Sequence, residues 1–110
     1  MSFDTKIADR IRKKLGKRKG LTEKKMFGGI AFMVNGNMCC GVHRDKMIVR
    51  VDPEETDVVL KEKHTRIFDL SGGRPMKGWI LVQQKGVATD SALAKWVGVG
   101  LKYASSLPAK

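Results

Sequence analysis

Residues 24–42 read KKMFGGIAFMVNGNMCCGV, and the Asn35-Gly36 step at their centre decides the fold. An Asn-Gly pair between two apolar runs adopts the positive φ angles of a two-residue type I′ hairpin turn. Side chains of a strand alternate between its faces, so the turn also predicts which residues lie together before it. One face is expected to hold Met26, Ile30, Phe32 and Val34, and the other Phe27, Ala31 and Met33. A strand that is apolar on both faces belongs at the centre of a sheet, or under a helix or a partner.

Downstream of the hairpin, the pattern continues with one more strand and a short helix. A weaker turn at Arg44-Asp45 leads into a strand over residues 47–51, which completes a three-stranded antiparallel meander. Asp52 then caps a proline-started helix that ends near Lys63. The glutamates that follow the proline suit the positive end of the helix dipole.

The C-terminal part of the chain predicts two further strands and a closing helix. The strands cover residues 66–70 and 79–83, and the glycine-rich loop 71–78 joins them. Thr89 or Asp90 caps the helix. Helical spacing places on one face Leu93, Trp96, Val97, Gly100, Leu101 and Ala104. A glycine-lined helix face, here with glycines at 98 and 100, permits close approach of the helix backbone to a sheet.

The N-terminal residues 3–15 predict an amphipathic helix, capped by Ser2 and stopped by Gly16 or Gly20. Its apolar stripe comprises Phe3, Ile7, Ala8, Ile11 and Leu15. Its opposite face carries Lys6, Arg10, Lys13, Lys14, Lys17 and Arg18. The chain has a net charge of +11, and most of the excess is N-terminal. These six residues are therefore candidate nucleic-acid contacts, and a solvated face that serves solubility is the alternative interpretation.

Together the elements follow the order α-β-β-β-α-β-β-α. This order predicts a two-layer α+β fold, with a five-stranded antiparallel sheet and helices on one face. A chain of 110 residues has the usual size of one domain, so we expect a single domain over residues 1–110. No apolar run approaches the ~18–20 residues that span a bilayer, so we expect a cytoplasmic protein without membrane contacts.

The cysteines predict neither a metal site nor a catalytic centre. Strand alternation places Cys40 on the face of Met38 and Val42. Cys39 is expected on the other face with His43, so the pair is interpreted as two reduced thiols that pack as small hydrophobes. A structural zinc site needs four ligands on one site, but alternation separates Cys40 from His43, and His64 is the only further histidine, so no second Cys/His pair exists. We therefore expect no metal, no cofactor and no enzymatic activity.

Two glycine pairs have competing interpretations. Gly28-Gly29 lead into a strand rather than a helix, which favours a role in backbone geometry over a phosphate cradle. The second pair lies in the loop 71–78, the best candidate for a mobile element. The residues that make this loop flexible and basic are Gly72, Gly73, Arg74 and Lys77. A solvent-exposed connection is favoured there over a ligand lid.

Several of these features together resemble a known family. Met26-Phe27-Gly28-Gly29, followed by an apolar strand and the Asn-Gly turn, is similar to the N-terminal domain of TfoX/Sxy proteins. The Gly-Arg-Pro-Met loop and the closing helix with Trp96 are similar as well. The resemblance implies a fold related to secretion chaperones and a link to DNA-uptake competence. Full-length members act there as transcriptional co-activators with the cyclic-AMP receptor protein, and the family implies no catalytic residues.

Three functions remain open at this point. The first is a regulatory module that acts through contacts with a protein partner of unknown identity, with self-association also open. Because the full-length regulators carry a second, C-terminal domain and this sequence stops at Lys110, a different role for a stand-alone domain is open too. The second is a weak, sequence-tolerant nucleic-acid binder. Residues 10–25 contain no aromatic side chain that could stack on bases, which disfavours single-strand recognition. The third is a small-ligand protein or enzyme that uses the loop 71–78.

Overall fold

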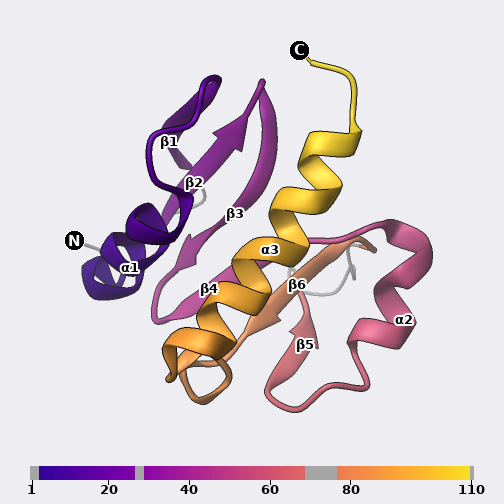
Figure 1. Ribbon diagram of the computed structural model, residues 1–110. Helices are drawn as coiled ribbons and strands as arrows, with labels where there is room; N and C mark the ends of the chain where they lie inside the picture. Colours follow the sequence, from indigo (N-terminus) through magenta and orange to yellow (C-terminus); the bar gives the residue numbers. More distant parts are fainter. Residues whose placement is uncertain (1–2, 27–28, 69–76, 110) are drawn as a thin grey trace.

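The computed structural model describes residues 3–26, 29–68 and 77–109, and its centre is one antiparallel sheet (Figure 1). The six strands lie in the order β1-β2-β3-β4-β6-β5. Their bounds are β1 Leu21–Met26, β2 Gly29–Val34, β3 Asn37–His43, β4 Lys46–Arg50, β5 Thr65–Ile67 and β6 Trp79–Val82. The helices are α1 Thr5–Leu15, α2 Thr56–Val59 and α3 Asp90–Ser106, with short 3₁₀ turns η1 Pro53–Glu55 and η2 Gln84–Val87. The predicted α+β class is confirmed, with six strands instead of five.

The Asn35-Gly36 hairpin is confirmed by backbone angles and register. Asn35 and Gly36 have φ values of 52° and 84°, and Val34 pairs directly with Asn37. Both central residues thus have the positive φ of a type I′ turn. The second turn is confirmed in the same way, because the residues on either side of Arg44-Asp45 are paired.

The additional strand is β1, which the sequence pattern did not predict. It pairs with β2 from Leu21↔Val34 to Met26↔Gly29. Met26 therefore belongs to a different strand from Ile30, and the prediction that they share a face of one strand was wrong. The strand carries Thr, Glu and two Lys between its ends, so no apolar alternation marks it. Such charged side chains are typical of edge strands, where they discourage pairing with other chains.

A β-bulge in β3 overturns the prediction that the two cysteines lie on opposite faces, although Cys40 does share the face of Val42. Phe32 pairs with Cys40 but Met33 pairs with Met38, which leaves Cys39 as an extra residue. One extra residue reverses the alternation of side chains beyond it. Cys39 and Cys40 consequently both pack in the core beneath the helices, whereas Met38 lies on the opposite face.

Both faces of the sheet are apolar, as the sequence predicted. The helix-covered face includes Phe32, Val42 and Val49, packed against residues of α1 and α3. The opposite face holds a smaller cluster, whose buried members are Ala31, Met38, Ile48 and Phe68. Phe68 also meets His43 edge to face, with ring centroids 5.6 Å apart.

The first helix is anchored at both ends. Asp4 caps it, because its carboxylate accepts hydrogen bonds from the backbone N–H groups of Lys6 and Ile7, at 2.9 and 3.2 Å. The predicted cap, Ser2, lies outside the described residues. Gly16 ends the helix at a φ of 62°, and its N–H donates to the carbonyl of Arg12. The predicted stop at Gly16 is therefore confirmed.

The closing helix α3 lies against the sheet at Gly100. A Cβ atom built there would lie 2.2 Å from the carbonyl oxygen of Cys39, whereas one at Gly98 would meet nothing within 4 Å. The prediction of close approach therefore holds for Gly100 and fails for Gly98. Thr89 provides the cap, because its hydroxyl accepts a hydrogen bond from the N–H of Ala92.

The region between β4 and β6 is less regular than predicted. The helix capped by Asp52 begins as the 3₁₀ turn η1 and continues for only one α-helical turn, α2. The strand predicted over residues 66–70 is the shorter β5, whose pairing continues through a hydrogen bond from Phe68 N to Trp79 O. Residues 69 and 70 lie outside the described part of the chain.

Candidate interaction surfaces

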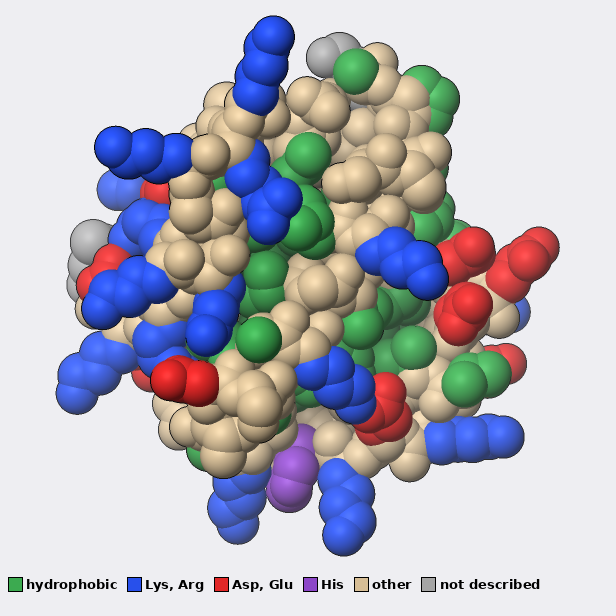
Figure 2. Space-filling model, viewed as in Figure 1, with side chains coloured by type: hydrophobic (Ala, Val, Ile, Leu, Met, Phe, Trp, Pro, Cys, Tyr) green, Lys and Arg blue, Asp and Glu red, His purple; other side chains and the backbone are tan. Residues whose placement is uncertain are grey.

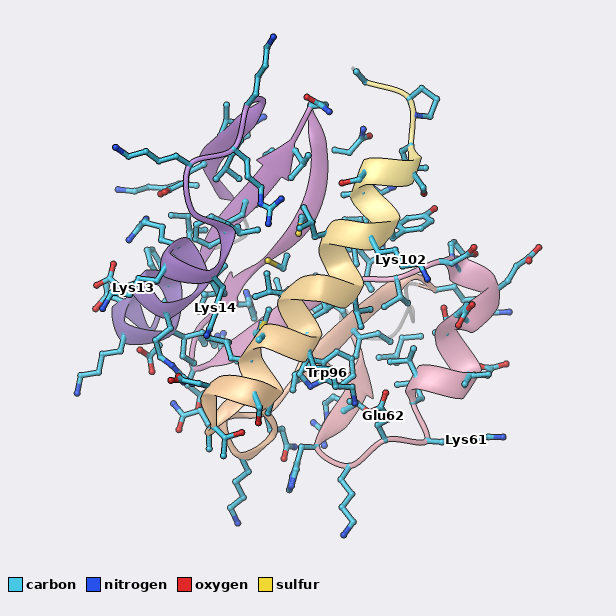
Figure 3. All side chains as sticks on the ribbon, in the orientation of Figure 1. Lys13, Lys14, Lys61, Glu62, Trp96 and Lys102 are labelled. Atoms are coloured by element: carbon cyan, nitrogen blue, oxygen red, sulfur yellow. The ribbon has the colours of Figure 1, made fainter. Side chains whose placement is uncertain are left out.

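The basic face of α1 is one of two surfaces that stand out. The stripe of Ile7, Ala8, Ile11 and Leu15 is buried, so the opposite side of the helix faces solvent. Figure 2 shows the resulting group of basic side chains over α1, and Lys13 and Lys14 are labelled there in Figure 3. The exposed members of the predicted set are Lys6, Lys13, Lys14, Lys17 and Arg18.

The six predicted residues divide into two groups. The Arg10 guanidinium donates to the carbonyl of Thr89 at 3.3 Å and lies 3.7 Å from the Asp90 carboxylate, so it ties α1 to the start of α3. The helix ends at Leu15, so Lys17 and Arg18 lie beyond it rather than on its face as predicted, and Arg18 donates to the carbonyl of Leu15. Within the described residues, no ion pair occupies the four remaining side chains, Lys6, Lys13, Lys14 and Lys17. These four lysines are therefore free to contact a polyanion.

Arg12, which the sequence analysis left out of the basic face, has a structural role. Its guanidinium donates two hydrogen bonds to the Glu23 carboxylate, at 2.7 and 2.9 Å, and also pairs with Asp9. The hydrogen bonds between these two side chains lower the pKa of Glu23 and raise the pKa of Arg12. Arg12 therefore joins α1 to the edge strand β1.

The second surface is a groove that sequence reasoning missed. It encloses about 410 Å³ between the η1–α2 segment and the C-terminal half of α3. Figure 2 shows hydrophobic side chains between these elements, with acidic side chains along the α2 side. The lining residues are Val51, Asp52, Glu55, Val58, Val59, Glu62, Val99, Lys102, Tyr103 and Ser106. The one sequence signal was Val58, an apolar residue within an acidic segment.

The groove has an apolar floor and a charged rim. Val58 is 60% exposed and is the one large hydrophobic side chain of that exposure among the described residues. The rim carries three carboxylates against the ammonium group of Lys102. One of the three, Glu62, pairs with Lys95 of α3. In Figure 3, Lys102 lies between α3 and α2, whereas Lys61 points away from the groove.

Both walls of the groove are held by interactions from outside it. The Thr56 hydroxyl donates to the carbonyl of Pro53 and accepts from the N–H of Gly78, both at 2.8 Å, which fixes the start of α2. On the other wall, the Arg50 guanidinium lies 5.4 Å from the ring centroid of Tyr103 and 5.1 Å from that of Trp79. Cation–π contacts of this kind hold the tyrosine ring in place.

Where they are described, the residues of the glycine motifs are not among those that line the groove. A Cβ atom at Gly29 would lie 1.9 Å from the carbonyl oxygen of Val42, so the close pairing of β2 and β3 requires glycine there. Phe27 and Gly28 lie outside the described residues, as do three members of the predicted mobile loop, Gly72, Gly73 and Arg74. The fourth, Lys77, is exposed.

The two cysteines are buried neighbours. Their sulfur atoms lie 3.8 Å apart and share a hydrogen bond. That hydrogen bond and burial raise the pKa of Cys40 well above its ordinary value, so this thiol stays protonated at neutral pH. Over residues 3–26, 29–68 and 77–109, no three His, Cys, Asp or Glu side chains gather as metal ligands. None of the described helices is long and apolar enough to cross a bilayer.

Comparison with known proteins identifies the family. A family model described as the TfoX N-terminal domain matches residues 13–104. The match covers the sheet and most of both walls of the groove. No curated protein and no solved structure matches the chain.

Proposed function

This chain belongs to the TfoX N-terminal domain family, and we propose that it is a non-enzymatic cytoplasmic module that regulates transcription by binding a protein partner. The family supports a regulatory or interaction-type domain in general. The observation that supports a protein partner is the groove between α2 and α3, because its apolar floor is left open by the fold. Exposed apolar clefts with polar rims are typical of protein interaction sites. The competence link of the TfoX/Sxy resemblance makes a transcription regulator the first partner class to test.

Capture from a lysate of the native host tests this function. The bait is the intact chain, and mass spectrometry identifies the retained proteins. The decisive variant is Val58→Gln, which removes an apolar contact in the groove without changing charge. We expect the parent to retain a transcription regulator that Val58→Gln retains much less. Circular dichroism shows whether the variant is folded.

A matched control separates groove binding from charge. The control is the quadruple variant Lys6→Gln, Lys13→Gln, Lys14→Gln and Lys17→Gln, which should retain the same partner as the parent. Retention of the same proteins by parent and Val58→Gln would contradict a role for the groove. Loss of the partner with the quadruple variant alone would instead assign the contact to α1.

A second function, sequence-tolerant nucleic-acid binding, is favoured by the four free lysines of α1 and the residues just after it. Their side chains are exposed on α1 and, for Lys17, just beyond its end, and have no carboxylate partner among the described residues. Lysine contacts with phosphates supply affinity without reading base sequence. We therefore expect any binding to duplex DNA to be weak and strongly dependent on salt.

A further inference from the structure

One wall of the groove, the η1–α2 segment with the residues that follow it, is the most acidic part of the chain. Residues 52–62 contain five of the eleven Asp and Glu residues and a single basic residue, Lys61. The side chains of Glu54 and Asp57 are exposed beside the three carboxylates of the rim. The whole chain carries a charge of +11, so this negative region is a local exception. Complementary charge favours a positively charged occupant and disfavours nucleic acid or an anionic lipid surface.

The floor of the groove requires apolar contacts from the same occupant. Val58, Val59 and Val99 present branched aliphatic side chains, and Tyr103 adds an aromatic ring. A second copy of this chain does not supply such contacts through its basic helix. The apolar residues of α1, including Ile7 and Ile11, are buried in its own core. The exposed face of α1 therefore has the right charge but lacks apolar side chains.

The elements that line the groove favour a helical occupant over an extended one. An extended peptide gains affinity by pairing with the free edge of a sheet. Here the lining comes from η1, α2 and α3, with Val51 just beyond the end of β4. The sheet edges, β1 and β5, contribute no lining residue. An amphipathic helix fills such a groove with side chains spaced three or four residues apart.

From these observations we propose that the groove binds a basic amphipathic helix of a protein partner, with aliphatic residues on one face and Lys or Arg beside them. The aliphatic face covers Val58 and Val99, and the basic residues face Asp52 and Glu55. The two walls are held in place from outside, by Thr56 and by the cation–π contacts of Tyr103, so little ordering is needed on binding. This inference rests on the proposed function and specifies the chemistry of the partner.

A titration with three synthetic peptides tests the inference. The peptides share leucines at positions i, i+3, i+4 and i+7 and differ only in the other positions, which are mainly Lys, Gln or Glu. Binding to the ¹⁵N-labelled chain is followed by NMR. We expect the Lys peptide to bind most tightly and the Glu peptide least. The largest chemical-shift changes should come from the backbone amides of Val58, Val99 and Tyr103. Added salt should weaken the binding of the Lys peptide alone.

Two variants separate the contributions of charge and apolar contact. Glu55→Gln should lower the affinity for the Lys peptide by about two- to fivefold, as expected for the loss of an exposed ion pair. The affinity for the Gln peptide should not change. Val58→Gln should weaken the Lys and Gln peptides alike by roughly tenfold, because it removes apolar burial. Lys13→Gln, on the other surface, is the control and should change neither affinity. Glu55 and Val58 are both exposed, so we expect both variants to fold like the parent.

Several outcomes would overturn the inference. They are equal affinity for the Lys and Glu peptides, no binding of the Lys peptide, and shifts confined to α1 or to the β1 edge. Unchanged affinity of a Lys peptide whose leucines no longer have helical spacing would also contradict a helical occupant. If the lysate experiment still finds a partner that depends on Val58, the proposed function stands and only the chemistry of the partner is wrong. If that experiment also fails, the groove is not an interaction site.

Discussion

Asn35 and Gly36 illustrate how single residues direct the backbone of this protein. Their positive φ values close the β2–β3 turn in two residues, and Val34 and Asn37 are then directly opposed. The Asn37 side chain donates to the carbonyl of Pro108 at 2.9 Å, so the same turn also holds the chain that follows α3. A change at this turn should therefore affect both the sheet and its contact with the C-terminal segment.

We expect Gly36→Val to destabilise the fold strongly. Positive φ costs an L-residue roughly 1–2 kcal/mol, and a β-branched side chain costs more. A loss of about 2 kcal/mol corresponds to a fall in Tm of roughly 10 °C for a domain of this size. Thermal unfolding followed by circular dichroism measures the change. Gly36→Asn is the matched control and should lose less stability, because Asn tolerates positive φ. An unchanged Tm for Gly36→Val would contradict the assignment of the turn.

At the scale of an element, α3 contains two glycines with opposite surroundings. Gly98 faces open space, whereas Gly100 faces the backbone of the bulged residue Cys39. Glycine in a helix interior costs up to ~1 kcal/mol relative to alanine. That cost is offset at Gly100 alone, because only there does the missing side chain let the helix approach the sheet.

Alanine substitutions at the two glycines should therefore change stability in opposite directions. Gly98→Ala should raise the free energy of unfolding by up to ~1 kcal/mol, through helix propensity. Gly100→Ala should lower it, because its Cβ would lie 2.2 Å from the carbonyl oxygen of Cys39 and overpacking typically costs about 1–3 kcal/mol. Urea denaturation measures both. A gain in stability from Gly100→Ala would show that the helix can shift away from the sheet at no cost.

The attachment of α1 to β1 should depend on pH. Arg12 lowers the pKa of Glu23 in the folded protein. The folded state therefore binds this proton more weakly than the unfolded state. The carboxylate stabilises the fold above its unfolded-state pKa, and this contribution is lost as pH falls through the lower folded-state value. Because both side chains are about 40% exposed, at 41% and 38%, the pair is worth at most about 1 kcal/mol.

Glu23→Gln should consequently lower the free energy of unfolding at neutral pH but not in acid. The free energies of unfolding of the parent and the variant, measured by urea denaturation, should differ by about 0.2–1 kcal/mol at pH 7. The difference should shrink towards zero below the folded-state pKa. Glu54→Gln is the control, because Glu54 has no ion pair among the described residues. A difference between parent and Glu23→Gln that stays constant from pH 7 to pH 3 would rule out the ion pair as its source.

At the scale of the whole molecule, the two candidate surfaces lie at opposite ends of the fold and have opposite charge. The basic helix α1 covers one end of the sheet, and the acidic η1–α2 segment lies at the other (Figure 1 and Figure 2). This arrangement permits the protein to meet a basic partner helix and a polyanion at the same time. The two surfaces can therefore be tested separately.

Salt titration of duplex DNA binding tests the basic surface. Replacing Lys6, Lys13, Lys14 and Lys17 by Gln should reduce the slope of log K against log salt by roughly 0.9 for each phosphate that the variant no longer neutralises. Arg10 and Arg18 are left in place because they bond to backbone carbonyls. The matched control replaces four exposed lysines elsewhere, Lys61, Lys63, Lys77 and Lys85. Equal slopes for both variants, or no binding by the parent at low salt, would eliminate nucleic-acid binding by α1.

The sequence by itself determined the features that depend on neighbouring residues. The Asn35-Gly36 turn follows from backbone preferences of two residues, and the buried stripe of α1 follows from helical spacing. Local sequence signals also predicted the strands of the central hairpin, the turn at Arg44-Asp45 and α3. The positions of Lys6, Lys13 and Lys14 on one helix were predicted in the same way, whereas Lys17 lies beyond the end of that helix.

The tertiary structure alone decided the features that depend on pairing between distant segments. The charged strand β1 forms because β2 offers it a ladder of hydrogen bonds, which no alternation in residues 21–26 announces. The bulge at Cys39 moves both thiols to one face, because one extra residue reverses every side chain beyond it. The groove joins residues 51–62 to residues 99–106. Its apolar floor and acidic rim exist only where the sheet brings α2 and α3 side by side, and spacing along the chain carries no record of that contact.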